Sequence, residues 1–223
     1  MTFIYKKFNK EIVLENKLNF IQFDNTNQMY EFGLDINKDK NEDEFYIVDD
    51  KNKQLKFGSC VGIITDVFTL DINDKKILTK LYKKIQVDFN EDDNKIYDAE
   101  RVIREASLKL LEEINSKVSI PLTYDDDFEL AEFFKLFNLK INFNDNNLIF
   151  NVTNYIEVML EFYEYKIIII PFISNILSSE DIKKLLEFAT QHDLYILSFA
   201  NLNNKFDESK DDNVIVVEDD IIL

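Results

Sequence analysis

Short apolar runs separated by polar residues mark the first 72 positions and predict strands. These runs lie at 11–16, 18–23, 45–48, 55–57 and 61–68. The polar stretch DDKNK between the third and fourth runs predicts a hairpin, and the last run is short enough for a buried strand. Residues 26–32 fit a short helix.

The pattern changes to helical periodicity from Asn73 to about Val118. Two segments, separated by the polar residues 90–94, each place apolar side chains on one face. The apolar positions are Ile77, Leu78, Leu81 and Ile85 in the first segment, and Ala99, Ile103, Ala106, Leu110 and Ile114 in the second. Two long amphipathic helices in succession predict either an antiparallel pair or a projecting arm.

Strand and helix patterns alternate again in the last hundred residues. We expect helices over 128–137 and 155–163 and a third from Ser178 or Ser179, where a serine can cap and two acidic residues follow. We expect strands at 140–143, 166–173, 194–200 and 214–217. Strand–helix–strand at this spacing predicts an α/β fold with a partly parallel sheet. The expected organisation is a head formed by 1–72 and 119–223, interrupted by a helical leg at 73–118.

Composition excludes several classes of protein. The chain is 46% hydrophobic, which is too apolar for a disordered protein, and its single cysteine, Cys60, excludes a disulfide framework. No apolar stretch approaches the ~18 residues of a membrane span, and the first residues lack a signal-peptide core. We therefore expect a soluble protein of the cytoplasm, without a membrane partner.

The charged residues of the chain give conflicting indications about whether it binds nucleic acid. The 43 acidic and 26 basic residues leave a net charge of −17, which disfavours a polyanionic partner, although a binding groove needs only a local positive field. Basic residues gather on the two predicted leg helices, away from their apolar faces, where they form either a solvated surface or contacts to phosphates. They are Lys76, Lys80, Lys83, Lys84, Arg101 and Arg104.

Known catalytic patterns are missing from the chain. The three glycines do not form a phosphate loop, because none precedes Lys-Ser or Lys-Thr. Cys60 and the single histidine, His192, are better explained as a small core residue and a helix-end residue than as a nucleophile and its base. The acidic run YDDDFE at 124–129 predicts either a helix cap or an oxygen-only site for Ca²⁺ or Mg²⁺.

Several segments, in their order and spacing, resemble one known family nearly from end to end. They are LENKLNFIQFDN (14–25), GIITDVFTLDIN (62–73), LTYDDDFELAEFFKLFNLKI (122–141), KIIIIPFISNILSSEDIKKLLEFATQHDLYILSF (166–199) and VIVVEDDIIL (214–223). The family is the short form of the Csn-two proteins, which take part in CRISPR spacer acquisition in type II-A systems.

The resemblance implies a head related to degenerate P-loop ATPases, without hydrolysis, and a helical leg. It also implies a homotetrameric ring with a basic central hole, calcium-dependent assembly and binding to the ends of linear double-stranded DNA. The implied partners are the CRISPR adaptation integrase proteins and the effector nuclease. We assign DNA contacts to the six basic residues above. We assign Ca²⁺ to Glu112, Asp125, Asp126, Asp127 and Glu129.

The expected function is therefore non-enzymatic DNA binding in antiviral defence. Two alternatives come from other classes of protein. One is a metal-dependent nuclease that uses the acidic run at 124–129. The other is a protein-binding scaffold of the adaptation complex that never touches DNA.

Overall fold

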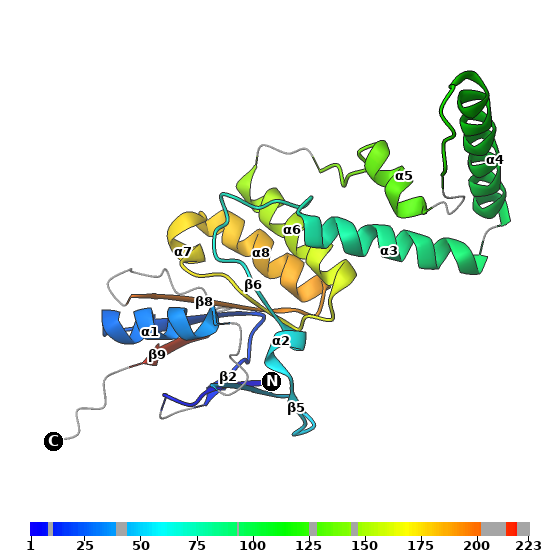
Figure 1. Ribbon diagram of the computed structural model, residues 1–223. Coiled ribbons are helices and arrows are strands. Elements are labelled where there is room, and N and C mark those ends of the chain that lie inside the picture. The colour runs from blue at the N-terminus through cyan, green and yellow to red at the C-terminus, as the bar shows by residue number, and fades with distance from the viewer. Residues whose placement is uncertain are drawn as a thin grey trace. The chain divides into compact units, whose positions relative to one another are not determined.

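The computed structural model describes residues 1–8, 11–38, 44–92, 94–124, 129–143, 147–201 and 213–217 (Figure 1). The chain divides into two compact units. Unit 1 combines residues 1–71 with 143–223, and unit 2 is the stretch 72–142 inserted between them. The mixed α/β class with a helical insertion agrees with the expectation from the sequence.

Unit 1 is built on a parallel sheet. Its strand order is β6-β7-β8-β3-β9, and the pairings between neighbours are parallel. The strands are β3 (Leu18–Phe23), β6 (Val61–Ile63), β7 (Ile167–Ile169), β8 (Tyr195–Asn201) and β9 (Asn213–Val217). All six residues of β3 are buried, as expected for a central strand covered on both faces.

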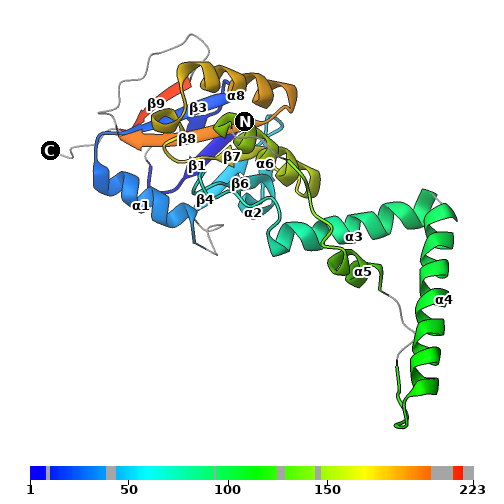
Figure 2. The same ribbon diagram turned by 90° about the horizontal axis from the view of Figure 1, so that it is seen from above.

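Helices cover both faces of this sheet, and alternate side chains of each strand serve the two sides (Figures 1 and 2). Leu18 and Phe20 pack in one cluster with α6 (Leu148–Phe162) and α8 (Ser179–Gln191). Ile21 and Phe23 pack in the other cluster with α1 (Thr26–Ile36). The short α7 (Ile173–Ile176) follows β7. This arrangement gives unit 1 a core on each side of the sheet.

A second, antiparallel sheet of order β2-β1-β4-β5 extends the core on the α1 side. Its strands are β1 (Thr2–Tyr5), β2 (Ile12–Val13), β4 (Phe45–Val48) and β5 (Gln54–Leu55). β4 and β5 form the hairpin predicted from the polar turn. Phe57 does not extend that hairpin but begins the short helix α2 (Phe57–Cys60). The aromatic rings of Phe3, Tyr5, Phe32 and Phe45 meet between this sheet and α1.

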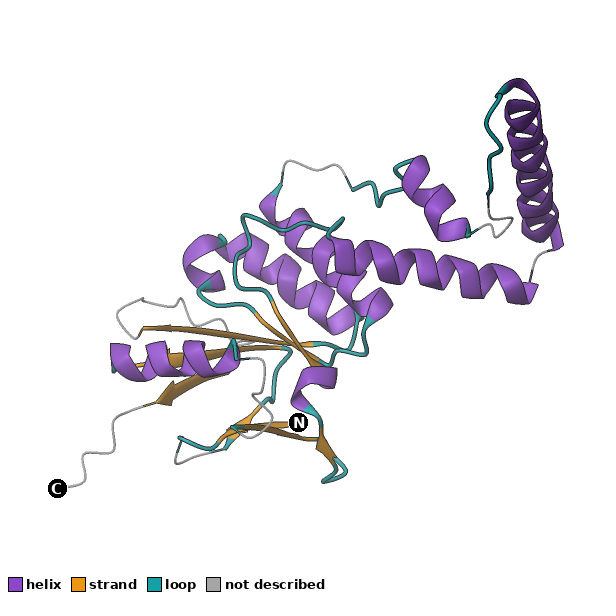
Figure 3. Cartoon of the chain, in the orientation of Figure 1, coloured by secondary structure: helices purple, strands orange, loops and turns teal. Residues whose placement is uncertain are grey.

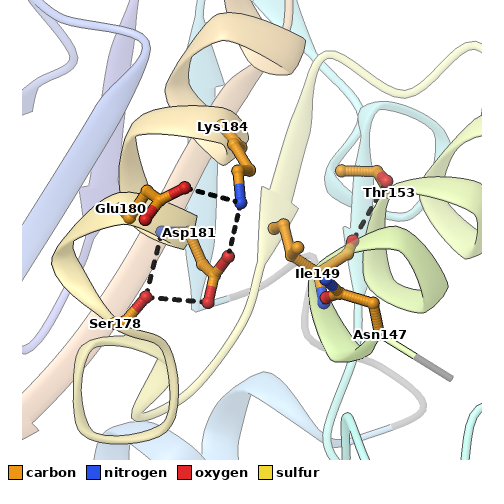
Figure 4. Close-up of polar contacts among 7 residues, drawn as sticks. All are labelled: Asn147, Ile149, Thr153, Ser178, Glu180, Asp181 and Lys184. Atoms are coloured by element: carbon orange, nitrogen blue, oxygen red, sulfur yellow. Dashed lines mark hydrogen bonds and ion pairs between the residues drawn. The ribbon is translucent and has the colours of Figure 1, made fainter.

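Side-chain caps decide where two helices of unit 1 begin (Figure 4). Ser178 Oγ accepts a hydrogen bond from the backbone N–H of Asp181 (3.2 Å), which confirms the predicted start of α8. Asn147 Oδ1 accepts from the backbone N–H of Ile149 (3.0 Å), so α6 begins at Leu148 and not near Tyr155 as predicted. An asparagine cap of this kind satisfies a donor that the first helical turn leaves without a partner.

Unit 2 contains the helices α3 (Lys75–Asp92), α4 (Asn94–Lys117) and α5 (Leu130–Leu136). Asp74 caps α3 by accepting from the backbone N–H of Lys76 (2.6 Å). The unit continues to Asn142, beyond the expected leg at 73–118, because α5 packs on α3 (Figure 3). The strand predicted at 140–143 is wrong, since this stretch adopts no regular secondary structure.

The two long helices of unit 2 do not form the antiparallel pair that the sequence left open. Leu110 and Ile114, from the apolar stripe of α4, are 62% and 41% exposed. α3 therefore does not cover that stripe.

Gly62 of β6 lies where a Cβ atom would force neighbouring side chains to shift. A Cβ atom there would come within 2.7 Å of Ile168 Cδ1 and 2.9 Å of Met159 Cε. We expect Gly62→Ala to lower the free energy of unfolding by about 1–3 kcal/mol in urea denaturation, the usual cost of overpacking a core. Gly33→Ala is the matched control, because its Cβ would meet Phe199 at an ordinary 3.7 Å and alanine favours the helix. Equal stability of the two variants would contradict this account.

Candidate nucleic-acid interface

The first half of α3 carries the densest basic surface suggested by the sequence. Lysines occupy five of the ten positions 75–84, and no acidic residue lies among them. Ile77 and Tyr82 are buried, whereas Lys76 and Lys83 are exposed and Lys80 and Lys84 partly exposed. The name α3 lysine face is used below for Lys76, Lys80, Lys83 and Lys84.

The helix dipole does not explain why lysines lie at the N-terminal end of α3. The N-terminal end of a helix carries partial positive charge, so cations in the first turns are unfavourable there. The first turn of α3 contains no acidic residue, and Asp74 alone supplies a carboxylate at the cap. The helix dipole therefore does not account for the lysines at the start of α3, which an anionic ligand would complement.

Most of the negative charge of the protein belongs to unit 1 and not to unit 2, which contains this helix. Unit 1 contains 28 acidic and 14 basic residues, a net −14, whereas unit 2 contains 15 acidic and 12 basic residues, a net −3. Unit 2 is thus nearly balanced in charge. The overall value of −17 is therefore a poor guide to the local field at α3.

The two arginines predicted to contact DNA lie beside carboxylates of their own helix. Arg101 is 3.6 Å from Asp98 Oδ1, and Arg104 is 3.7 Å from Glu100 Oε1. Such exposed pairs on one helix are weak and can exchange for a phosphate, but each carboxylate reduces the local positive potential. The α3 lysine face is the stronger of the two predicted basic surfaces by its density of lysines, since no acidic residue lies within 75–84.

The predicted calcium cluster falls mostly outside the described residues. Asp125, Asp126 and Asp127 belong to that part, whereas Glu112 on α4 and Glu129, the N-cap residue of α5, are both exposed. Within the described parts of the chain, no group of three or more Asp, Glu, His or Cys side chains could hold a metal ion. The chain after α4 does return along that helix, because Leu122 N–H donates to Asn115 Oδ1 at 3.1 Å (Figure 2).

Cys60 and His192 have the local roles that the sequence favoured. Cys60 is buried, and burial raises the pKa of its thiol to about 11, so the reactive thiolate is disfavoured at neutral pH. His192 is the C-cap residue of α8, and its ring packs on Phe188 with 4.3 Å between centroids. Neither environment resembles that of an activated nucleophile or its base.

Sequence analysis missed an ionic cluster around the buried Asp35. Tyr5 Oη donates to Asp35 Oδ2 at 2.6 Å, Lys7 Nζ lies 2.7 Å from the same oxygen, and Lys38 pairs with Oδ1. Burial alone would raise the pKa of the Asp35 carboxyl, but the hydrogen bonds from Lys38, Lys7 and Tyr5 outweigh burial and hold this pKa well below its usual range. The cluster joins the end of α1 to β1, and its only sequence signal was an acidic residue beyond the expected end of that helix.

Fold and surface together define an α/β protein whose inserted helical unit carries a basic face. Residues 37–219 match the model of the family described as CRISPR-associated protein (Cas_Csn2). The chain belongs to this family, which confirms the resemblance seen in the sequence and implies a role in CRISPR adaptation. No curated protein matches the chain. In the described residues, no helix is both long and apolar enough to cross a membrane.

Proposed function

We propose that this protein is a non-enzymatic, ring-forming protein that binds the ends of double-stranded DNA during CRISPR spacer acquisition in the cytoplasm. The observation that carries the proposal is the α3 lysine face, four lysines within residues 76–84 of one helix in a stretch that contains no acidic residue. Lysine heads on one face suit phosphates, which carry no sequence information, so binding should be independent of sequence. The proposed partners are the adaptation integrase proteins and the effector nuclease.

The parallel sheet of unit 1 is compatible with the proposed relation to degenerate P-loop ATPases. The glycine-rich phosphate loop of an active ATPase is missing from the sequence, as only three glycines occur in the whole chain. We accordingly propose a head that retains an α/β scaffold without ATP hydrolysis.

A single assay separates DNA binding from the nuclease alternative. Purified protein is incubated with linear duplex DNA in Mg²⁺ or Mn²⁺, and both complex formation and cleavage are followed. The proposal requires a shifted, intact duplex. Sustained cleavage would favour the nuclease, and neither shift nor cleavage at low salt would favour a scaffold that never touches DNA.

Self-association is the second part of the proposal, and the exposed apolar stripe of α4 supports it. Leu110 and Ile114 leave apolar surface on this stripe that a second copy of the chain would cover, and closed symmetric assemblies are the usual outcome for identical chains. The proposed assembly is a homotetramer, most simply a dimer of dimers.

We expect Leu110→Glu to reduce the assembly mass seen by light scattering at micromolar protein in calcium, because a carboxylate in an apolar contact is costly. Ser116→Glu adds the same charge to an exposed position of α4 away from the stripe and should leave the mass unchanged. A wild-type protein that is monomeric under these conditions rules out the ring.

Calcium is the proposed cofactor of this assembly. Clustered carboxylates at 125–129, with Glu112 from α4, suit the six to eight oxygen ligands that Ca²⁺ takes. Calcium should raise the melting temperature in a concentration-dependent way, because a ligand that binds only the folded state stabilises it by mass action. Asp125→Asn with Asp126→Asn should abolish this rise in calorimetry. If calcium leaves the wild-type melting temperature unchanged, the acidic cluster is a solvated helix cap and not a calcium site.

A further inference from the structure

The chain that follows α5 lies against α3 without secondary structure of its own. Two side chains of the α3 region bind its backbone. Tyr82 Oη donates to the carbonyl of Leu139 at 2.8 Å, and the Asn73 carboxamide binds Ile141 twice. We call residues 139–141 the strap.

The Asn73 side chain forms hydrogen bonds with the backbone of the strap, as a neighbouring β-strand would. Its Nδ2 donates to the Ile141 carbonyl at 3.0 Å, and its Oδ1 accepts from the Ile141 N–H at 2.9 Å. One side chain therefore satisfies both backbone groups of a residue that lies in no sheet. No aliphatic residue in place of Asn73 could do the same.

The strap and α5 are joined as one piece. Asn138 turns the chain at the end of α5 with a left-handed backbone (φ 51°), and the Leu139 N–H then donates to the Phe134 carbonyl at 2.9 Å. Residues 130–141 thus form a short helix with its following strap attached.

Little apolar burial holds this piece on α3. α5 has seven residues, none of them buried, and Leu136 and Phe137 are 79% and 68% exposed. One aromatic contact to α3 joins Phe134 to Tyr82, with ring centroids 5.5 Å apart. A helix this short is unstable alone, and segments with few buried contacts open most readily.

We propose that residues 130–141 are a latch that opens from α3 as one cooperative unit, and that the side chains of Asn73 and Tyr82 keep it closed. Opening uncovers the Tyr82 ring, which lies on a different side of α3 from the α3 lysine face. The latch therefore controls access to the Tyr82 ring of α3. This inference goes beyond the proposed function and does not depend on DNA binding.

Hydrogen exchange of the full-length protein, resolved by peptide, tests the latch. In the wild type, residues 130–141 should exchange faster than the part of α3 before residue 88. Asn73→Ala should accelerate exchange across the whole of 130–141 by about tenfold or more, because two hydrogen bonds that close the latch are lost. Tyr82→Phe should act in the same direction with a smaller effect, since it removes one hydrogen bond and keeps the ring.

Asn115→Ala is the matched control, because Asn115 also accepts from a backbone N–H, that of Leu122, outside the latch. It should leave exchange in 130–141 unchanged. The latch is overturned if wild-type 130–141 exchanges no faster than α3, or if Asn73→Ala accelerates only the Ile141 amide and Tyr82→Phe accelerates none.

Discussion

Changing the four residues of the α3 lysine face to glutamine together should remove most of the affinity of the protein for duplex DNA. Each lysine–phosphate contact releases counterions from the DNA when the complex forms. For each contact that is lost, the slope of log K against log salt should therefore become less steep by about 0.9. At 0.1 M salt the expected loss lies between about tenfold and the roughly thousandfold that four such contacts can supply. Fluorescence anisotropy with a labelled linear duplex measures both quantities.

Arg101→Glu with Arg104→Glu provides the comparison on α4. This variant should also weaken binding for every DNA sequence about equally, but by less, because each arginine already lies beside a carboxylate. If the arginine variant loses more affinity than the lysine variant, α4 carries the interface and our ranking of the two helices is wrong. If both variants keep the wild-type affinity and salt slope, neither face contacts phosphates.

Asp35→Ala should cause a large loss of stability in unit 1. The change leaves the buried Tyr5 hydroxyl without its acceptor and removes the bonds to Lys7 and Lys38. We expect urea denaturation at pH 7 to show a loss of about 2–4 kcal/mol, because an unsatisfied buried hydroxyl and lost charge-assisted bonds both contribute. The lysine heads are about half exposed and regain water, which keeps the loss below that for a fully buried ion pair.

The same cluster gives a pH dependence with a defined sign. Because the pKa of Asp35 is lowered on folding, its stabilisation is fully present above the ordinary carboxyl pKa of about 4 and is lost as the pH falls below that value. The stability gap between wild type and Asp35→Ala should therefore be smaller at pH 3 than at pH 7. Tyr5→Phe, which keeps the carboxylate and both lysines, should preserve most of this pH dependence. A gap independent of pH would contradict the ionic role of Asp35.

The sequence predicted the parallel sheet because buried strands have local signals. The apolar run around Ile168 and the serine before α8 both point to structure within a few residues of themselves. β1 was not predicted, since Thr2–Tyr5 is polar at one end and becomes a strand through pairing with β4. Residues 140–143 alternate polar and apolar side chains as a strand does, but the described structure pairs them with no strand. The Asn73 side chain binds the backbone of Ile141 instead. Such pairings depend on residues distant in sequence.

Candidate site residues were predictable only as faces of helices. The spacing of Lys76, Lys80 and Lys83 places them on one side of α3, which the burial of Ile77 supports. The partners of Arg101 and Arg104 were also within reach, at i−3 and i−4 on the same helix. Asp35 could not be found in this way, because its partner Tyr5 is 30 residues away and burial is a property of the fold.

Titration of the wild-type protein with linear duplex DNA and with a covalently closed circle of the same sequence, across a salt series, tests the central claim most directly. A ring that must be entered by a DNA end predicts tight binding to the linear form and weak binding to the circle. Binding through phosphates predicts an affinity that falls steeply with salt for any sequence. Absence of binding to the linear duplex at low salt, or affinity that does not change with salt, would contradict it.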